Sequence, residues 1–138
     1  MPIVTRTNFA SDPTHGGFTG SVQLDSRTAT VAVRPSPGSI DAAWDNAERV
    51  LTFLRDQMPL IEQAVRDLFS RLGSPSEDTP AGRRKIERML GRLRECDMTC
   101  RIHDDAASVY FDAPRLTDHV IEVQFTKGGK LASATVAG

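Results

Sequence analysis

His119 is the side chain best placed for acid–base chemistry in this sequence. Counting back by twos from Ile121 and Val123, it opens an expected strand, with Asp118 beside it and Asp112 across a predicted hairpin. An imidazole next to a carboxylate can titrate near neutrality and act as a general base. One hypothesis is therefore an enzyme that uses His119 with Asp112 or Asp118 as acid and base. We favour the alternative, a strand-end imidazole bonded to a backbone carbonyl, because no nucleophile at a matching spacing is present.

Cys96, Cys100 and His103 follow one another closely enough to suggest a zinc site. Thiolates and imidazoles are preferred zinc ligands. In an extended strand, however, Cys96 and Cys100 would lie roughly 13 Å apart at ~3.3 Å per residue, and His103 would point to the opposite face. We therefore expect no metal and no cofactor. Cys100 should be a small buried side chain, and Cys96 should stand at the end of a helix.

A basic stretch lies directly before an acidic one. Six basic residues face the single acid Glu87, whereas the stretch 95–122 holds seven carboxylates against two arginines. The basic residues are Arg83, Arg84, Lys85, Arg88, Arg92 and Arg94. On a helix, this Arg83–Arg94 stretch could contact phosphates, but it has no interleaved aromatic residue for base stacking, so nucleic acid is not the favoured partner. A solvated helix face is the simplest interpretation, and electrostatic steering toward a charged protein is the alternative.

Alternating apolar and polar residues predict strands on both sides of a helical middle. Period-2 alternation marks a hairpin over 21–34, broken by Pro35, and further strands within 98–103, 108–112, 121–126 and 132–136. The glycine pair at 128–129 suits a tight hairpin turn. Each strand shows one apolar and one polar face, as in an antiparallel sheet that is covered on one side only.

The helical middle carries an apolar seam with a spacing of three and four residues from Ile40 to Leu72. Pro59 removes an amide donor within this seam, so we expect two helical segments that meet at a kink near Gln57–Pro59. Gly73 should end the second segment. Thr79-Pro80 predicts the start of a third helix. The chain order ββαααββββ indicates a two-layer α+β domain with about six strands and the helices packed on one face of an antiparallel sheet.

Composition sets the outer limits of function. The sequence is 39% hydrophobic and 25% charged with a formal net charge of −1, which excludes a generally basic nucleic-acid coat and a strongly acidic mimic. No apolar run approaches the ~20 residues that cross a bilayer, and residues 1–17 lack the apolar core of a secretory signal. We expect a cytoplasmic protein with a loose arm over 1–17 and a single domain over 18–138.

Three stretches together resemble a group of uncharacterised bacterial proteins that share a domain of unknown function. They are Phe18-Thr19-Gly20 before the first strands, the Trp44-bearing helix, and the closing His119-x-Ile121-x-Val123 with Ala137-Gly138. Asp118 and Gly128 replace a glycine and an aspartate of that pattern. The resemblance implies a role like that of toxin-immunity or interaction modules and supplies no catalytic residue.

The polar face of the predicted sheet is the surface through which we expect the protein to bind a partner. Tyrosine and arginine are enriched in binding hot spots, and this face should combine both with other hydrogen-bonding side chains. Its expected partner-binding residues are Thr99, Arg101, Tyr110, Glu122 and Gln124. We predict a protein-interaction module that binds a protein partner or forms a homodimer, rather than an enzyme.

Overall fold

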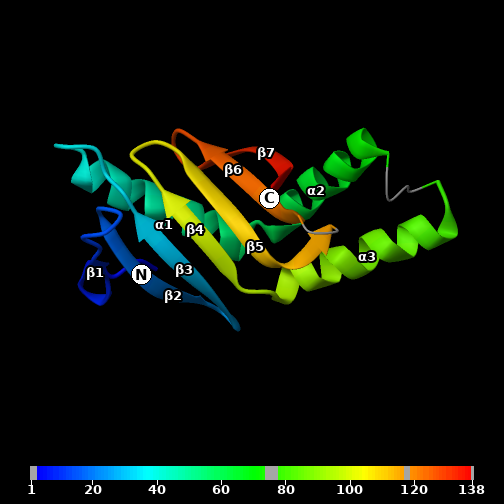
Figure 1. Ribbon diagram of the computed structural model, residues 1–138, viewed down its shortest axis with the longest axis horizontal. Coiled ribbons are helices and arrows are strands. Elements are labelled where there is room, and N and C mark those ends of the chain that lie inside the picture. Colours follow the sequence, from blue (N-terminus) through cyan, green and yellow to red (C-terminus); the bar gives the residue numbers. More distant parts are fainter. Residues whose placement is uncertain (1–2, 74–77, 117–118, 138) are drawn as a thin grey trace.

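Over the residues that it describes, a computed structural model shows a seven-stranded sheet with three helices (Figure 1). The structure describes residues 3–73, 78–116 and 119–137, and for 113–116, 119 and 137 it describes the backbone alone. The strands are β1 (Ala10–Ser11), β2 (Phe18–Leu24), β3 (Arg27–Val33), β4 (Met98–Ile102), β5 (Ala107–Leu116), β6 (His119–Thr126) and β7 (Lys130–Ala137). The helices are α1 (Ile40–Asp56), α2 (Met58–Leu72) and α3 (Pro80–Glu95), and a short 3-10 turn spans Arg6–Asn8.

The strands lie in the sheet in the order of the chain, from β1 to β7. Neighbours pair antiparallel except β3 and β4, which run parallel. The prediction of a fully antiparallel sheet with about six strands is therefore wrong in the direction of one strand pair and in the number of strands. The parallel pair has a simple cause: α1, α2 and α3 all lie between β3 and β4 in the chain, and this long helical connection carries the chain back to the end of the sheet at which β3 began.

The extra strand is β1, and it belongs to the stretch that was predicted to be a loose arm. Ala10 and Ser11 pair with Thr19 and Phe18 of β2. Upstream, the amides of Ile3 and Val4 donate to the two carboxylate oxygens of Glu48 in α1, at 2.6 and 2.7 Å. Residues 3–11 therefore lie against the sheet and α1.

One aromatic contact strengthens this attachment. The Phe9 ring meets the edge of the Trp44 ring at a centroid distance of 4.9 Å, and the Arg6 guanidinium lies 5.4 Å from the centre of the same indole. Edge-to-face packing and a cation over an indole are both favourable arrangements. Residues 3–11 are thus held by contacts that strand periodicity cannot reveal.

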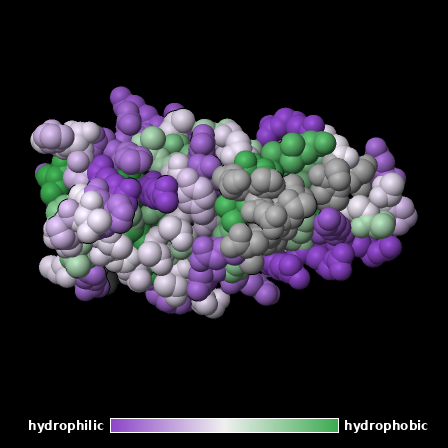
Figure 2. Space-filling model, in the orientation of Figure 1, coloured by the Kyte–Doolittle hydropathy of each residue, from purple (hydrophilic) through white to green (hydrophobic). Residues whose placement is uncertain are grey.

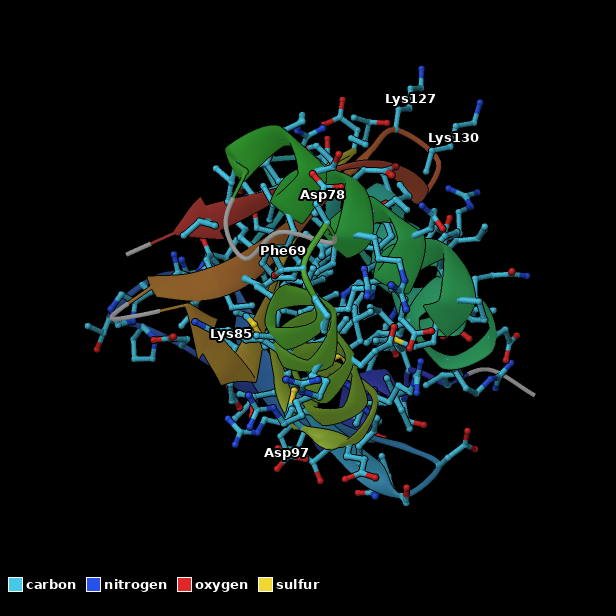
Figure 3. The ribbon with its side chains drawn as sticks, turned by 90° about the vertical axis from the view of Figure 1, so that its right-hand side faces the viewer. Phe69, Asp78, Lys85, Asp97, Lys127 and Lys130 are labelled. Atoms are coloured by element: carbon cyan, nitrogen blue, oxygen red, sulfur yellow. The ribbon has the colours of Figure 1, made fainter. Side chains whose placement is uncertain are left out.

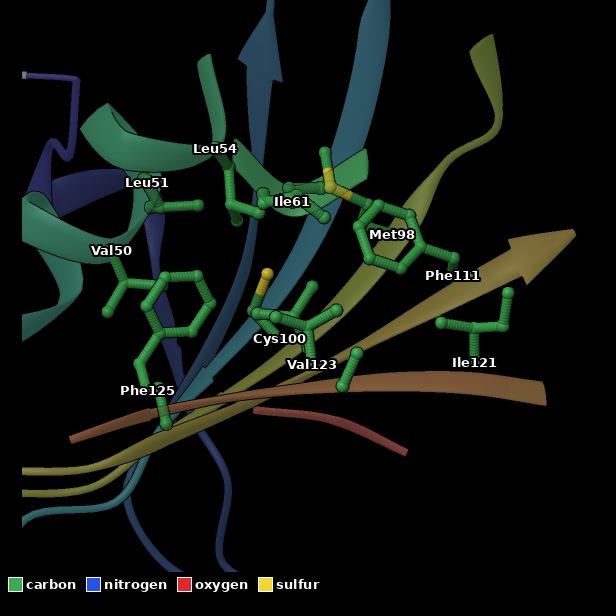
Figure 4. Close-up of a cluster of buried hydrophobic side chains, with 14 of the residues drawn as sticks. Val50, Leu51, Leu54, Ile61, Met98, Cys100, Phe111, Ile121, Val123 and Phe125 are labelled. Atoms are coloured by element: carbon green, nitrogen blue, oxygen red, sulfur yellow. The ribbon is translucent and has the colours of Figure 1, made fainter. Parts of the chain in front are cut away.

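The core fills the space between the sheet and the helices (Figure 4). Alternate residues of each long strand point into it, among them Met98, Cys100, Phe111, Ile121 and Val123, all with at most 1% of their surface exposed. The helices supply matching stripes, which include Val50, Leu51, Leu54, Ile61, Val65, Phe69, Ile86, Leu90 and Leu93. The predicted arrangement, one apolar sheet face under amphipathic helices, is confirmed.

The long apolar seam is divided where the proline predicts. α1 ends at Asp56, Gln57 adopts a non-helical conformation, and α2 begins at Met58 with Pro59 in its first turn. A proline there loses no helical hydrogen bond, because the first amides of a helix have no partner within it. Gly73 ends α2 in the left-handed conformation, at φ 73°. The two helices can therefore follow the sheet at different angles, as Figure 1 shows.

α3 is fixed at both ends. The Thr79 hydroxyl accepts the amide of Gly82 at 3.0 Å, as the Thr-Pro signal predicts. At the other end, the Arg27 guanidinium donates to the carbonyls of Leu93 and Arg94, at 2.9 and 2.7 Å. A cation suits the negative end of the helix dipole. Burial lowers the pKa of Arg27, yet these carbonyls keep the charged side chain in place beside β3.

Candidate functional site

The five predicted partner-binding residues lie on the sheet face opposite the helices. Figure 1 views this face, and α1 passes behind the strands. Thr99 pairs with Tyr110, and Tyr110 pairs with Glu122, so these three side chains form one row across β4, β5 and β6. Arg101 and Gln124 both pair with Ser108 and belong to the neighbouring row. We call the surface made by Thr99, Arg101, Tyr110, Glu122 and Gln124 the open face.

The register shows which threonines lie in line with the open face. The row through Tyr110 continues to Thr30 on one side and to Thr135 on the other. Sequence alternation places these threonines on the same side as Tyr110, but it does not say which strands are neighbours. For Thr30, the missing information was the parallel pairing of β3 with β4.

Arg101 and Tyr110 form the most specific contact of the open face. The Arg101 guanidinium carbon lies 5.2 Å from the centre of the Tyr110 ring. A guanidinium over an aromatic face is held by electrostatic attraction and stays available for hydrogen bonding at its edge. Arg101 is exposed and Tyr110 is half-buried. The stacked pair therefore presents a flat group with several donors.

The neighbours of this pair are held by hydrogen bonds within the face. The Thr99 hydroxyl donates to the Asp112 carboxylate at 3.3 Å, and the Gln124 amide donates to Glu122 at 3.3 Å. Glu122 is half-buried and Gln124 is exposed. Figure 2 shows a surface of mixed polarity over the strands, with strongly hydrophilic side chains gathered in the left half of the view. Such a surface can bind a partner through hydrogen bonds and through the stacked pair.

The acid–base hypothesis falls largely outside the described residues. Asp118 is not described, and His119 is described only by its backbone, which begins β6 opposite Leu116. Asp112 is exposed, and its carboxylate takes the Thr99 hydroxyl on the open face. No observation brings Asp112 together with the histidine ring, so the enzyme stays a prediction.

The cysteines occupy the positions that the strand geometry predicts. Cys100 is fully buried in β4, and Cys96 follows the last residue of α3, with its thiol 3.8 Å from the Leu93 carbonyl. Burial raises the pKa of the Cys100 thiol to about 12, so it stays protonated at neutral pH. Among the described side chains, no three His, Cys, Asp or Glu residues gather closely enough to hold a metal ion.

The basic stretch lies along the solvent side of α3. Ile86, Met89, Leu90 and Leu93 face the core, whereas Arg84, Lys85, Arg88 and Arg92 are exposed. Two further arginines connect the helices by ion pairs, Arg66 of α2 with Glu87 and Arg94 with Glu62 of α2. Arg84, Arg88 and Arg92 therefore form a stripe along the solvent side of the folded helix.

Comparison with known proteins adds no assignment. No family model matches the chain, and neither a curated protein nor a solved structure matches it. In the described part of the chain, none of the helices has both the length and the apolar character that crossing a membrane requires.

Proposed function

We propose that this protein is an interaction module that binds another protein through the open face, with the stacked Arg101 and Tyr110 at the centre of the contact. The observation that carries the proposal is the gathering of three further polar side chains, Thr99, Glu122 and Gln124, in the same two adjacent rows as this pair. β4 and β5 are interior strands of the seven-stranded sheet, so the pair has paired strands on both sides.

The pair has the properties of a binding hot spot. Arginine and tyrosine are over-represented among the residues that dominate binding energy, especially near the middle of an interface. Stacking on Tyr110 limits the motion of Arg101, so less conformational entropy is lost when a partner binds. A partner carboxylate opposite Arg101 would complete a two-point hydrogen bond with the fork of the guanidinium.

The surrounding residues favour a folded partner with a polar surface. Thr99, Glu122 and Gln124 offer donors and acceptors on a face made of extended strands. The resemblance noted from the sequence gives this proposal a narrower form, in which the partner is a toxin-like protein and the present chain is its immunity-like inhibitor. A second copy of the chain is the alternative occupant.

The test is affinity capture with the native chain and with the double variant Arg101→Glu/Tyr110→Ala, followed by binding of the purified captured protein. We expect a protein that the native chain retains, that the double variant loses, and that binds the native chain in isolation with at least tenfold higher affinity than the variant. Arg49→Glu, an equal charge change at an exposed position of α1, is the matched control and should bind normally.

Two results would contradict the proposal. In one, the same proteins with the same affinities are recovered by the native chain and by the double variant. In the other, light scattering shows a dimer that the double variant abolishes, with no second protein captured; the open face would then be a contact between copies. Matching circular dichroism spectra of the native chain and the variants would establish that each of them folds.

A further inference from the structure

We propose that a second surface, the exposed side of α3, binds an acidic segment of a protein partner. We call this surface the basic ridge and define it as Arg84, Lys85, Arg88 and Arg92, all of which are exposed. It lies on a different element from the open face, so the inference does not depend on the function proposed above. Figure 2 shows strongly hydrophilic side chains over α3, at the lower right of the molecule.

The ridge has a regular spacing. Arg84, Arg88 and Arg92 succeed one another at four-residue intervals, which correspond to ~6 Å along the axis of a helix. Shallow depressions lie on both sides of Arg88. One, of about 620 Å³, is lined by Pro80, Arg83, Arg84, Glu87 and Arg88, and the other, of about 210 Å³, by Lys85, Arg88, Met89 and Arg92. Carboxylate groups could enter both depressions and reach the Arg88 guanidinium from either side.

The fold uses other basic residues of this region, but not those of the ridge. Arg94 pairs with Glu62, and Arg66 of α2 pairs with Glu87 of α3, so these arginines hold the two helices together. Within the described part of the chain, Arg84, Arg88 and Arg92 form no ion pair. Their charges are therefore available to a partner.

The N-terminal part of the ridge also acts against the stability of its own helix. Like charges four residues apart on a helix repel one another. The first turn of α3 contains no acidic residue, and Arg84 stands close to the positive end of the helix dipole. Neither arrangement helps α3 to fold, and an anionic partner would relieve both.

The observations favour a protein carboxylate over a nucleic acid. α3 carries no aromatic side chain on which a base could stack. The chain as a whole has a net charge of −1, and Asp97 and Asp112 lie just beyond the end of α3, so a long polyanion would also meet repulsive groups. A short acidic helix with a carboxylate at every fourth residue repeats at the same ~6 Å and matches the ridge without extending past it. Arginine also binds carboxylates through two parallel hydrogen bonds.

The experiment is a titration of the ¹⁵N-labelled full chain, followed by NMR at low ionic strength. The probe is an alanine-rich helical peptide with a glutamate at every fourth position, and a peptide with glutamine at those positions is the ligand control. We expect the glutamate peptide to shift the amide signals of residues 84–92, and the shifts to decrease as salt is added. The glutamine peptide should leave these signals in place.

A pair of charge-matched variants identifies the surface. Arg88→Gln/Arg92→Gln removes two charges from the ridge, whereas Lys127→Gln/Lys130→Gln removes two from the β6–β7 turn. Figure 3 shows this turn well apart from Lys85 of α3. We expect the ridge variant to bind the glutamate peptide at least fivefold more weakly and the turn variant to bind it like the native chain. Equal weakening in the two variants, or no change in either, would overturn the proposal.

A single-stranded RNA of twelve nucleotides is the competing probe. It should shift the signals of residues 84–92 less than the glutamate peptide does at equal concentration. If the RNA binds the ridge more tightly than the peptide, the ridge recognises phosphates and the protein partner proposed here is wrong.

Discussion

Asn46 shows how a single polar residue can organise part of this fold. It is the one buried polar side chain among the described residues, with 2% of its surface exposed. Its amide group donates from α1 to the carbonyls of His103 and Ala106, at 3.1 and 3.0 Å, and so holds the turn between β4 and β5. Asn46 stands three residues after Ala43 and four before Val50, and it shares the buried face of α1 with them.

Replacing Asn46 should destabilise the protein in a graded way. Asn46→Ala removes both hydrogen bonds and leaves two carbonyls without this donor, at a cost of about 1–3 kcal/mol. Asn46→Asp should cost more, because it turns a carboxylate oxygen toward carbonyl oxygens. Urea unfolding at pH 7 measures both changes, and Asn8→Ala at an exposed position is the control. If Asn46→Asp were as stable as the native chain, the described donor role of the side-chain amide would be wrong.

The turn between β6 and β7 illustrates what the sequence predicts about an element and what it leaves out. The glycine pair at 128–129 predicts a tight turn, and both residues adopt a positive φ, of 80° and 72°. The sequence does not reveal that the turn packs against α1. A Cβ added to Gly129 would lie 2.7 Å from the Cβ of Arg49, whereas one added to Gly128 would meet nothing within 4 Å.

The two glycines should therefore differ sharply in their tolerance of alanine. Gly128→Ala should cost about 1–2 kcal/mol, the penalty of a left-handed conformation for a residue with a Cβ. Gly129→Ala adds a backbone-adjacent clash with α1 and should cost ~1–3 kcal/mol more. Thermal unfolding of the two variants gives the comparison directly. Equal melting temperatures would mean that the turn does not contact α1 as described.

The elements that the sequence predicts well are those with a long periodic pattern. Alternation located the strands from β2 to β7, and the break at Pro59 separated α1 from α2. The strand β1 was missed because two residues cannot show a period, and the nearby Asp12-Pro13 and Gly16-Gly17 indicate a loop. The parallel pairing of β3 and β4 was missed although its signal was present, since three helices between two strands form a crossover connection.

At the scale of the whole molecule, the two candidate surfaces were predictable to different degrees. The basic ridge follows from the spacing of Arg84, Arg88 and Arg92 alone, because neighbours on a helix are fixed by sequence distance. The open face needs the order and register of the strands, which join Arg101 and Tyr110 to residues distant in the chain. Strand alternation gives the side of a sheet to which a residue points, but long-range pairing decides its neighbours.

The two edge strands of the sheet differ in length, and an arginine side chain protects the longer one. β1 forms one edge with two residues, whereas β7 forms the other with eight. Between Lys130 and the end of β7 there is no further charge and no proline, the usual devices that keep an exposed edge from pairing. From α2, the Arg71 guanidinium donates to the Ala134 carbonyl of β7 at 3.2 Å. This bond occupies an acceptor in the middle of the strand and places a charge beside it.

Removing the Arg71 side chain should promote association between molecules. We expect Arg71→Ala to self-associate at lower concentration than the native chain. The Ala134 carbonyl would lose its side-chain donor and the middle of β7 would lose the charge beside it, so β7 could pair with β7 of a second copy. Sedimentation velocity across a hundredfold range of concentration measures the effect, with Arg55→Ala, another exposed arginine at a helix end, as the control. A matching sedimentation coefficient for Arg71→Ala and the native chain throughout that range would show that β7 is protected by something other than Arg71. Increased association in both variants would assign the effect to net charge instead of to the edge.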